Sequence, residues 1–156
     1  MTTFTMSTVT SDDLDALVAS VAGLFSEDAG QHDTSVNLNW PAREGAAYYS
    51  KLMNDPACLV LLARDDDRVV GHLVGKLTGP SSIQTTRTAV LESLRVTPDS
   101  RQVGVGSLLV THFLDWARGS GAQRASVTAF AANDTAQRFY ARHGFVPASV
   151  ISQVAL

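Results

Sequence analysis

A glycine turn near the middle of the chain constrains the fold more than any other stretch. Residues 96–107 read Val-Thr-Pro-Asp-Ser-Arg-Gln-Val-Gly-Val-Gly-Ser. An apolar run at 89–96 precedes them and an amphipathic run at 107–117 follows, so a strand, a turn and a helix come in direct succession. Gly104 and Gly106 have no Cβ, which lets a ligand approach the backbone closely. The helix directs free N–H groups and the positive end of its dipole into the turn, where a phosphate or pyrophosphate is the natural ligand.

Two better-known phosphate-binding loops do not fit this turn. The P-loop requires Gly-Lys-Ser/Thr, and no lysine follows these glycines. The dinucleotide-binding fingerprint requires a further glycine or alanine where this chain has Leu109. Arg101 could add a cation at the rim of the turn. Many strand-to-helix turns carry glycine for steric reasons only, so this stretch by itself leaves an anion site and a plain turn equally open.

A second motif follows further along the chain. Residues 133–145 read Asn-Asp-Thr-Ala-Gln-Arg-Phe-Tyr-Ala-Arg-His-Gly-Phe. This pattern, together with Leu-x-Val-x-Pro and Arg-x-x-Gly-x-Gly at 94–106, resembles the two signatures of the GNAT superfamily of N-acetyltransferases, in the same order. The resemblance covers about residues 88–147, whereas residues 1–87 fit the family in layout only.

The resemblance implies an α/β fold with three layers. A mixed central sheet would contain a splayed pair of parallel strands and carry helices on both faces. The length predicts one domain, 1–156. The hydrophobic pattern predicts strands at 4–9, 58–63, 69–77, 88–96, 125–130 and 150–156, and helices at 11–30, from 41 onward, at 107–117 and at 134–143. The strand at 125–130 should run parallel to the one at 88–96, because a helix connects them, and the strand at 150–156 should close the sheet.

The composition excludes several classes of partner. The net charge of −3 gives no basic footprint for nucleic acid. Cys58 is the one cysteine, so no intrachain disulfide or cysteine metal cluster can form, and the aspartates at 65–67 are expected to face water rather than a metal. The longest apolar run, 57–63, is too short to span a bilayer, and the N-terminus lacks a signal-peptide pattern. We expect a cytoplasmic protein without a membrane partner; a homodimer stays open.

Tyr140 is the residue that the resemblance implies as the general acid. Acetyl transfer to an amine requires removal of a proton from the amine, stabilisation of the carbonyl oxygen and protonation of the leaving thiolate. In the family the two substrates meet directly, which agrees with the lack of a Ser-His-Asp or Cys-His motif here. Tyr140 would protonate the thiolate. Alternatively it is a core aromatic, because it shares a helical face with Ala136 and Phe139.

Glu92 is the candidate for the base. It stands in an otherwise apolar strand, in alternation with Val90, Leu94 and Val96, and a carboxylate is costly to bury there unless it is paired or functional. The family often places a general base, or a carboxylate that holds a water, on this strand. An ion pair with Arg95 or another cation is the alternative.

The remaining site residues follow from the resemblance. Backbone groups at 94–96 would pair with the pantetheine arm as an added strand does, and backbone N–H groups at 102–107 would hold the pyrophosphate. The implied acetyl-CoA site is Leu94, Arg95, Val96, Arg101, Gln102, Val103, Gly104, Val105, Gly106, Ser107 and Asn133. Asn133 is also a good helix cap. The polar segment at 27–40 would shape the acceptor pocket, with Asp28, His32 and Asp33 as substrate-binding candidates, or would be a solvated connector.

The sequence therefore predicts an acetyltransferase that moves an acetyl group from acetyl-CoA to a primary amine of a small molecule in a ternary complex. A protein N-terminus or lysine as the acceptor, and an acyl-CoA-binding module without turnover, remain the alternatives. Negative charge from Glu27, Asp28, Asp33 and Glu92 would favour a cationic, polyamine-like amine over one with a free carboxylate.

Overall fold

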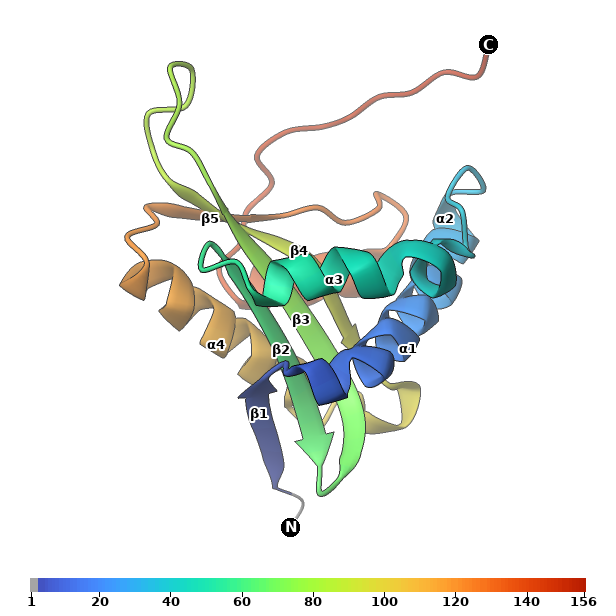
Figure 1. The fold of residues 1–156 in the computed structure, drawn as a ribbon. Coiled ribbons are helices and arrows are strands. Elements are labelled where there is room, and N and C mark those ends of the chain that lie inside the picture. Colours follow the sequence, from blue (N-terminus) through green and yellow to red (C-terminus); the bar gives the residue numbers. More distant parts are fainter. Residues whose placement is uncertain (1–2) are drawn as a thin grey trace.

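A five-stranded sheet separates two layers of helices in the computed structural model, which describes residues 3–156 (Figure 1). The strands are β1 (Phe4–Thr8), β2 (Cys58–Asp65), β3 (Arg68–Thr78), β4 (Thr88–Val96) and β5 (Arg124–Val127). They lie in the order β1-β2-β3-β4-β5, with antiparallel pairing as far as β4 and parallel pairing between β4 and β5. The mixed sheet with one parallel pair confirms the predicted fold class.

The helices follow the predicted order, with short irregular turns at their ends. They are α1 (Leu14–Leu24), α2 (Gly30–His32), α3 (Ala46–Met53), α4 (Val105–Gly119) and α5 (Asp134–Arg142). The first helix was expected to end near residue 30, but a π-helical turn at Phe25–Ala29 joins α1 to α2 and carries it on to His32. A second π-helical turn, Pro41–Gly45, leads into α3. Such turns are frequent at functional sites. None of the helices in residues 3–156 is long and apolar enough to cross a membrane.

Alternate side chains of β2 belong to two separate apolar cores, one on each face of the sheet. Leu59 and Leu61 point to the face covered by α4, whereas Val60 and Leu62 point to the face covered by α1 and α3, because successive side chains of a strand face opposite sides. The first core is centred on Phe113 of α4, which is fully buried. Both faces of the sheet are therefore covered, which gives the three layers.

A bulge in β4 redirects the side chains around Glu92. In the register between β3 and β4, Val74 faces Ser93 and Gly75 faces Leu91, so Glu92 is the extra residue. The bulge changes the phase of the strand. The α4 core contains Leu91, Leu94 and Val96. Glu92 and Ser93, in contrast, both line a cavity on the opposite face of the sheet. The expected alternation of Glu92 with Leu94 was therefore wrong.

The parallel pair is short. It extends from Thr88 opposite Arg124 to Leu91 opposite Val127, and β5 ends there rather than at residue 130. Beyond this point β4 continues to pair with β3, but within residues 3–156 it has no strand partner on its β5 side. Residues 92–96 thus present a free backbone edge, and this is the splayed strand pair that the sequence predicted.

The predicted strand at 150–156 does not form. Residues 145–156 contain no helix or strand, and they lead away from the sheet (Figure 1). Val150, Ile151 and Val154 are more than three-quarters exposed, at 88%, 80% and 82%. An apolar pattern makes a strand favourable only where a partner strand or a core is within reach, and in the described chain this segment has neither.

His72 of β3 is buried, and its side chain lies between the sheet and α1. Its Nδ1 lies 2.6 Å from Ser20 Oγ on α1, and its Nε2 lies 2.7 Å from Ser93 Oγ on β4. A neutral imidazole donates through one nitrogen and accepts at the other, so both contacts can be satisfied without a charge. Burial, with a smaller contribution from the charge of Arg95, lowers the pKa of His72 to about 3.

Acidification should therefore destabilise the fold through His72. The folded chain excludes a proton that the unfolded chain binds below its pKa of about 6.5, so this contribution to stability is complete above about pH 6.5 and is lost as the pH falls. We expect urea unfolding to show a loss of about 2 kcal/mol between about pH 7 and pH 5 in the native chain that His72→Gln lacks. His112→Gln, exposed on α4, is the control and should behave as the native chain does. The same pH dependence in the native chain and in His72→Gln would contradict this assignment.

Candidate active site

The glycine turn at the N-terminus of α4 presents free backbone donors. The N–H of Leu108 donates to the carbonyl of Gly104 at 3.0 Å, which is the first bond of the helical ladder. The N–H groups of Val105, Gly106 and Ser107 precede it and have no acceptor within the helix. Gln102 and Gly104 have φ values of 63° and 98°, and left-handed residues of this kind turn successive N–H groups toward one point. The turn can therefore bind an anion.

The two glycines of the turn serve different purposes. A Cβ built on Gly104 meets nothing within 4 Å, so open space lies beside the backbone there. A Cβ on Gly106 would lie 3.2 Å from Cζ of Phe139 on α5 and 3.7 Å from a methyl group of Val96 on β4. Gly106 thus permits close packing of α4, whereas Gly104 keeps open the space that a ligand would enter.

The two arginines near the turn are both paired with Glu27. Arg95 donates to its two carboxylate oxygens at 3.1 and 2.7 Å, and Arg101 donates to one of them at 2.7 Å. The hydrogen bond from Arg95 and the charges of both guanidinium groups lower the pKa of Glu27. Arg101 also donates to the carbonyl of Val96 at 2.9 Å and stays half-exposed at the rim. Arg95 therefore does not pair with Glu92, and what residues 94–96 offer a ligand is their backbone.

Asn133 links the start of α5 to the π-helical turn that follows α1. Its Oδ1 accepts from the N–H of Ala136 at 3.1 Å, which caps α5, and its Nδ2 donates to Asp28 at 3.1 Å. His32 lies 3.9 Å from Asp28, and its ring lies 5.3 Å from that of Phe130. Asp28 and His32 are thus brought together beside Phe130 and the start of α5. Asp33 is not part of this group, because it accepts two hydrogen bonds from Ser35 within its own turn.

Tyr140 lies on α5 with its ring against the α4 core. Its ring contacts those of Phe139 and Phe145 edge-on, at centroid distances of 5.3 and 5.7 Å. Burial, and to a lesser extent the charge of Asp28, raises the pKa of Tyr140 to about 12. The phenol therefore keeps its proton throughout the neutral range and can donate it in a hydrogen bond.

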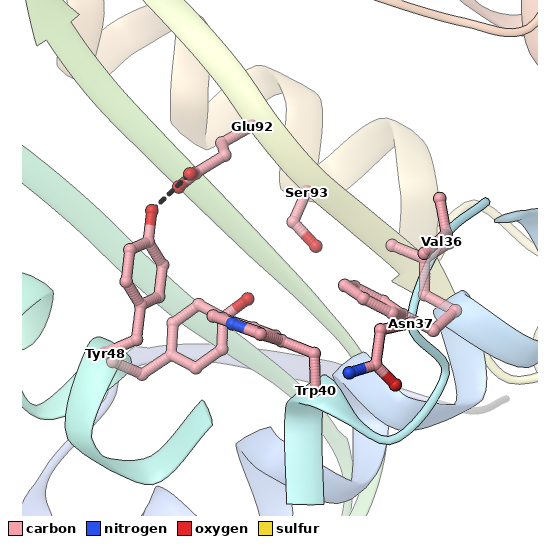
Figure 2. Close-up of a pocket in the computed structure, with 9 residues that line it drawn as sticks. Val36, Asn37, Trp40, Tyr48, Glu92 and Ser93 are labelled. Atoms are coloured by element: carbon pink, nitrogen blue, oxygen red, sulfur yellow. Dashed lines mark hydrogen bonds between the residues drawn. The ribbon is translucent and has the colours of Figure 1, made fainter. Parts of the chain in front are cut away.

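A cavity of about 460 Å³ opens on the other face of the sheet, between α1, α3 and β4 (Figure 2). Its lining residues are Leu24, Phe25, Val36, Asn37, Trp40, Tyr48, Tyr49, Glu92 and Ser93. The hydroxyl of Tyr48 donates to Glu92 Oε1, as the dashed line in Figure 2 shows. Of the expected acceptor-site residues, Glu92 lines this cavity, whereas Asp28, His32 and Asp33 do not.

Sequence reasoning missed Trp40 and Tyr48 as site residues. The expected acceptor segment, 27–40, included Trp40 without a role of its own, and Tyr48 lay beyond that segment, so neither was connected with Glu92. The one available signal was three aromatic residues within a short span beside that segment. Among residues 3–156, no three His, Cys, Asp or Glu side chains come together in a way that would hold a metal ion.

Comparison with known proteins identifies the family. Residues 22–145, most of the chain, match the acetyltransferase (GNAT) family. An uncharacterized N-acetyltransferase of Mycobacterium tuberculosis is 31% identical over 104 residues, which cover 67% of this chain and 63% of that relative. The match thus spans less than two thirds of the relative's length. The chain belongs to the GNAT family of acetyltransferases.

Solved structures show the same fold at lower identity. An aminoglycoside acetyltransferase from an uncultured soil metagenomic sample, in complex with sisomicin, has a TM-score of 0.72 at 18% identity, over 98% of this chain and 96% of that one. AAC(6')-Iy, in complex with a bisubstrate analog of coenzyme A and acetylneamine, has a TM-score of 0.74 at 13% identity, over 99% and 98% of the two chains. These similarities support the fold.

Gly104 gives a direct test of the anion site. Gly104→Ala should weaken the binding of acetyl-CoA at least about tenfold, because the methyl group enters the open space beside the donors. Isothermal titration calorimetry measures this affinity. Gly121→Ala is the matched control, since Gly121 also has a positive φ, of 77°, and open space around its Cβ, but lies beyond the far end of α4. Both variants place an alanine at a positive φ, so an equal change in affinity would show that backbone strain, and not the ligand's space, is responsible.

Proposed function

We propose that the protein transfers an acetyl group from acetyl-CoA to the primary amine of a small molecule, directly and in a ternary complex. One observation carries the proposal. The free edge of β4 at residues 92–96 leads at one end to the glycine turn, and at the other it has Glu92 in the wall of the cavity. One strand thus joins an anion site to a pocket that contains a carboxylate.

The residues present fit acetyl-CoA. The N–H groups at the start of α4 and the open space at Gly104 suit the pyrophosphate. The backbone groups that residues 94–96 direct away from β3, apart from the Val96 carbonyl that accepts from Arg101, suit the amide groups of the pantetheine arm, in the way that an added strand pairs with a sheet edge. When bound, acetyl-CoA supplies the acetyl group as an activated thioester. A neighbour of the same fold is in complex with a coenzyme A analog, which supports this assignment.

Glu92 and Tyr48 would receive the amine. An amine reaches the site as an ammonium ion, and the carboxylate of Glu92 attracts it and accepts its proton, directly or through a water. Burial and the neighbouring Glu92 raise the pKa of Tyr48, so its phenol stays protonated and holds Oε1 of Glu92 as a donor. The second carboxylate oxygen is left for the amine.

Tyr140 would assist the departing thiolate. A thiol has a reference pKa of about 8.5, so a phenol with a pKa raised to about 12 is the weaker acid. A hydrogen bond from the phenol nevertheless stabilises negative charge on sulfur as the bond to carbon breaks, before any proton has moved fully. The half-buried ring of Tyr140 is oriented by its contacts with Phe139 and the α4 core.

A small molecule is the preferred acceptor because the cavity is of ligand size. Two solved structures of this fold are complexes with sisomicin and with an acetylneamine bisubstrate analog. The test is the release of free thiol from acetyl-CoA in the presence of amines. Release of thiol with peptides that carry a free N-terminus or lysine, but with none of the small-molecule amines, would favour a protein acceptor. Tight binding of acetyl-CoA without release by any amine or peptide would identify an acyl-CoA-binding module.

Tyr140→Phe separates catalysis from packing. The change removes the hydroxyl and keeps the ring against Phe139 and Phe145, so the melting temperature and the affinity for acetyl-CoA should stay close to native. General acid assistance is typically worth about 10²–10⁴ in rate. We expect kcat to fall at least about tenfold in a free-thiol assay. A loss limited to stability or to cofactor affinity would make Tyr140 a packing residue, and full activity would assign the proton to another group.

A further inference from the structure

The cavity beside Glu92 has an aromatic wall. The rings of Phe25 and Trp40 stack with their centroids 5.8 Å apart and their planes 11° from parallel. Tyr48 and Tyr49 meet Trp40 edge-on, at 5.3 and 6.1 Å. Trp40 is therefore held by three aromatic neighbours in a fixed orientation, and it offers a preformed surface for a flat or compact apolar group. Figure 2 shows Trp40 and Tyr48 on one side of the cavity and Glu92 across from them.

Glu92 is the one acidic residue that lines this cavity within residues 3–156. The other acids that were expected to surround the acceptor do not line the cavity and have hydrogen-bond partners elsewhere. Glu27 is bound by Arg95 and Arg101, Asp28 accepts from Asn133, and Asp33 accepts from Ser35. A single carboxylate can balance a single ammonium group. A second ammonium group in the cavity would face largely apolar side chains and no second carboxylate.

We infer that the acceptor is a primary monoamine with an aromatic or compact apolar body, of the 2-phenylethylamine type. The ammonium group lies at Glu92 Oε2, and the body lies against Phe25 and Trp40. This assignment rests on the proposed function and narrows it: spermidine-like polyamines and aminoglycosides, which carry several charges, are poor fits. Asn37 and Ser93 supply the remaining polar groups of the lining, which is enough for one or two hydrogen bonds to a substituent.

The first experiment compares acceptors and measures binding separately. Release of free thiol from acetyl-CoA should give a kcat/KM for 2-phenylethylamine at least about tenfold above those for spermidine and sisomicin. Binding of 2-phenylethylamine is followed by Trp40 fluorescence in a Trp116→Phe background, because Trp116 packs with Phe113 on the other face of the sheet. If a polyamine or an aminoglycoside is the best acceptor, the inference about the acceptor is wrong, whereas the proposed acetyl transfer is supported. Binding of 2-phenylethylamine without any thiol release would contradict the proposed acetyl transfer but would support the preference of the cavity for this class of amine.

The second experiment tests the wall and the carboxylate by substitution. Trp40→Ala should raise the KM for 2-phenylethylamine at least about tenfold while the KM for ethylamine, which is too short to reach the wall, changes less than about twofold. If Trp40→Ala does not fold, Phe25→Leu keeps an apolar side chain and should raise the same KM selectively. Equal changes for both amines would overturn the inference.

Glu92→Gln should raise the KM for both amines, because it removes the one carboxylate of the cavity and keeps the shape of the side chain. Glu44→Gln is the matched control: Glu44 is exposed on the turn that leads into α3 and does not line the cavity. We expect Glu44→Gln to retain native KM values for both amines. Unchanged KM values in Glu92→Gln, or an equal effect of the two substitutions, would overturn the assignment of the ammonium group to Glu92.

Discussion

The site depends on the point at which β4 and β5 stop pairing. A backbone edge inside a protein must find hydrogen-bond partners, and a strand that loses its neighbour has N–H and C=O groups to offer. Here the loss occurs after Leu91 and Val127, directly before the bulge at Glu92. The free edge and the redirected carboxylate therefore belong to the same short segment. If the pairing continued, the edge would be closed, and without the bulge Glu92 and Ser93 could not both face the cavity.

Features set by local sequence could be predicted. The strand–turn–helix succession around Gly104 follows from hydrophobic pattern and glycine placement, and the structure has it. The helix that carries Tyr140 begins directly after Asn133, whose side chain caps it, and ends before Gly144. These are interactions between residues close in sequence, so a pattern of a few residue types is sufficient to specify them. The parallel pairing of β4 and β5 was also predictable, because a helical crossover between adjacent strands leaves no other arrangement.

Features set by contacts between distant segments could not be predicted. Tyr48 and Glu92 are 44 residues apart, and Glu27 and Arg95 are 68 apart, so nothing in the neighbourhood of either residue indicates its partner. The bulge at Glu92 depends on the register with β3, which the β4 sequence does not contain. The segment at 150–156 has an apolar composition suited to a strand, but strand formation depends on a partner rather than on composition. The buried pair of hydrogen bonds at His72 was likewise hidden in a plain apolar strand pattern.

Glu27 balances the positive charge beside the glycine turn from within the protein. Because it pairs with both Arg95 and Arg101, and because the chain carries a net charge of −3, the surface exerts little long-range attraction on a polyanion. An anionic ligand is therefore not steered toward the turn over long distances, and its rate of encounter depends little on ionic strength. Under the proposed function, retention would come instead from oriented N–H groups at close range, which dissolved salt screens far less than separated surface charges. Affinity at this turn would then be a property of backbone shape, and it would persist in salt concentrations that dissociate a ligand held by surface arginines.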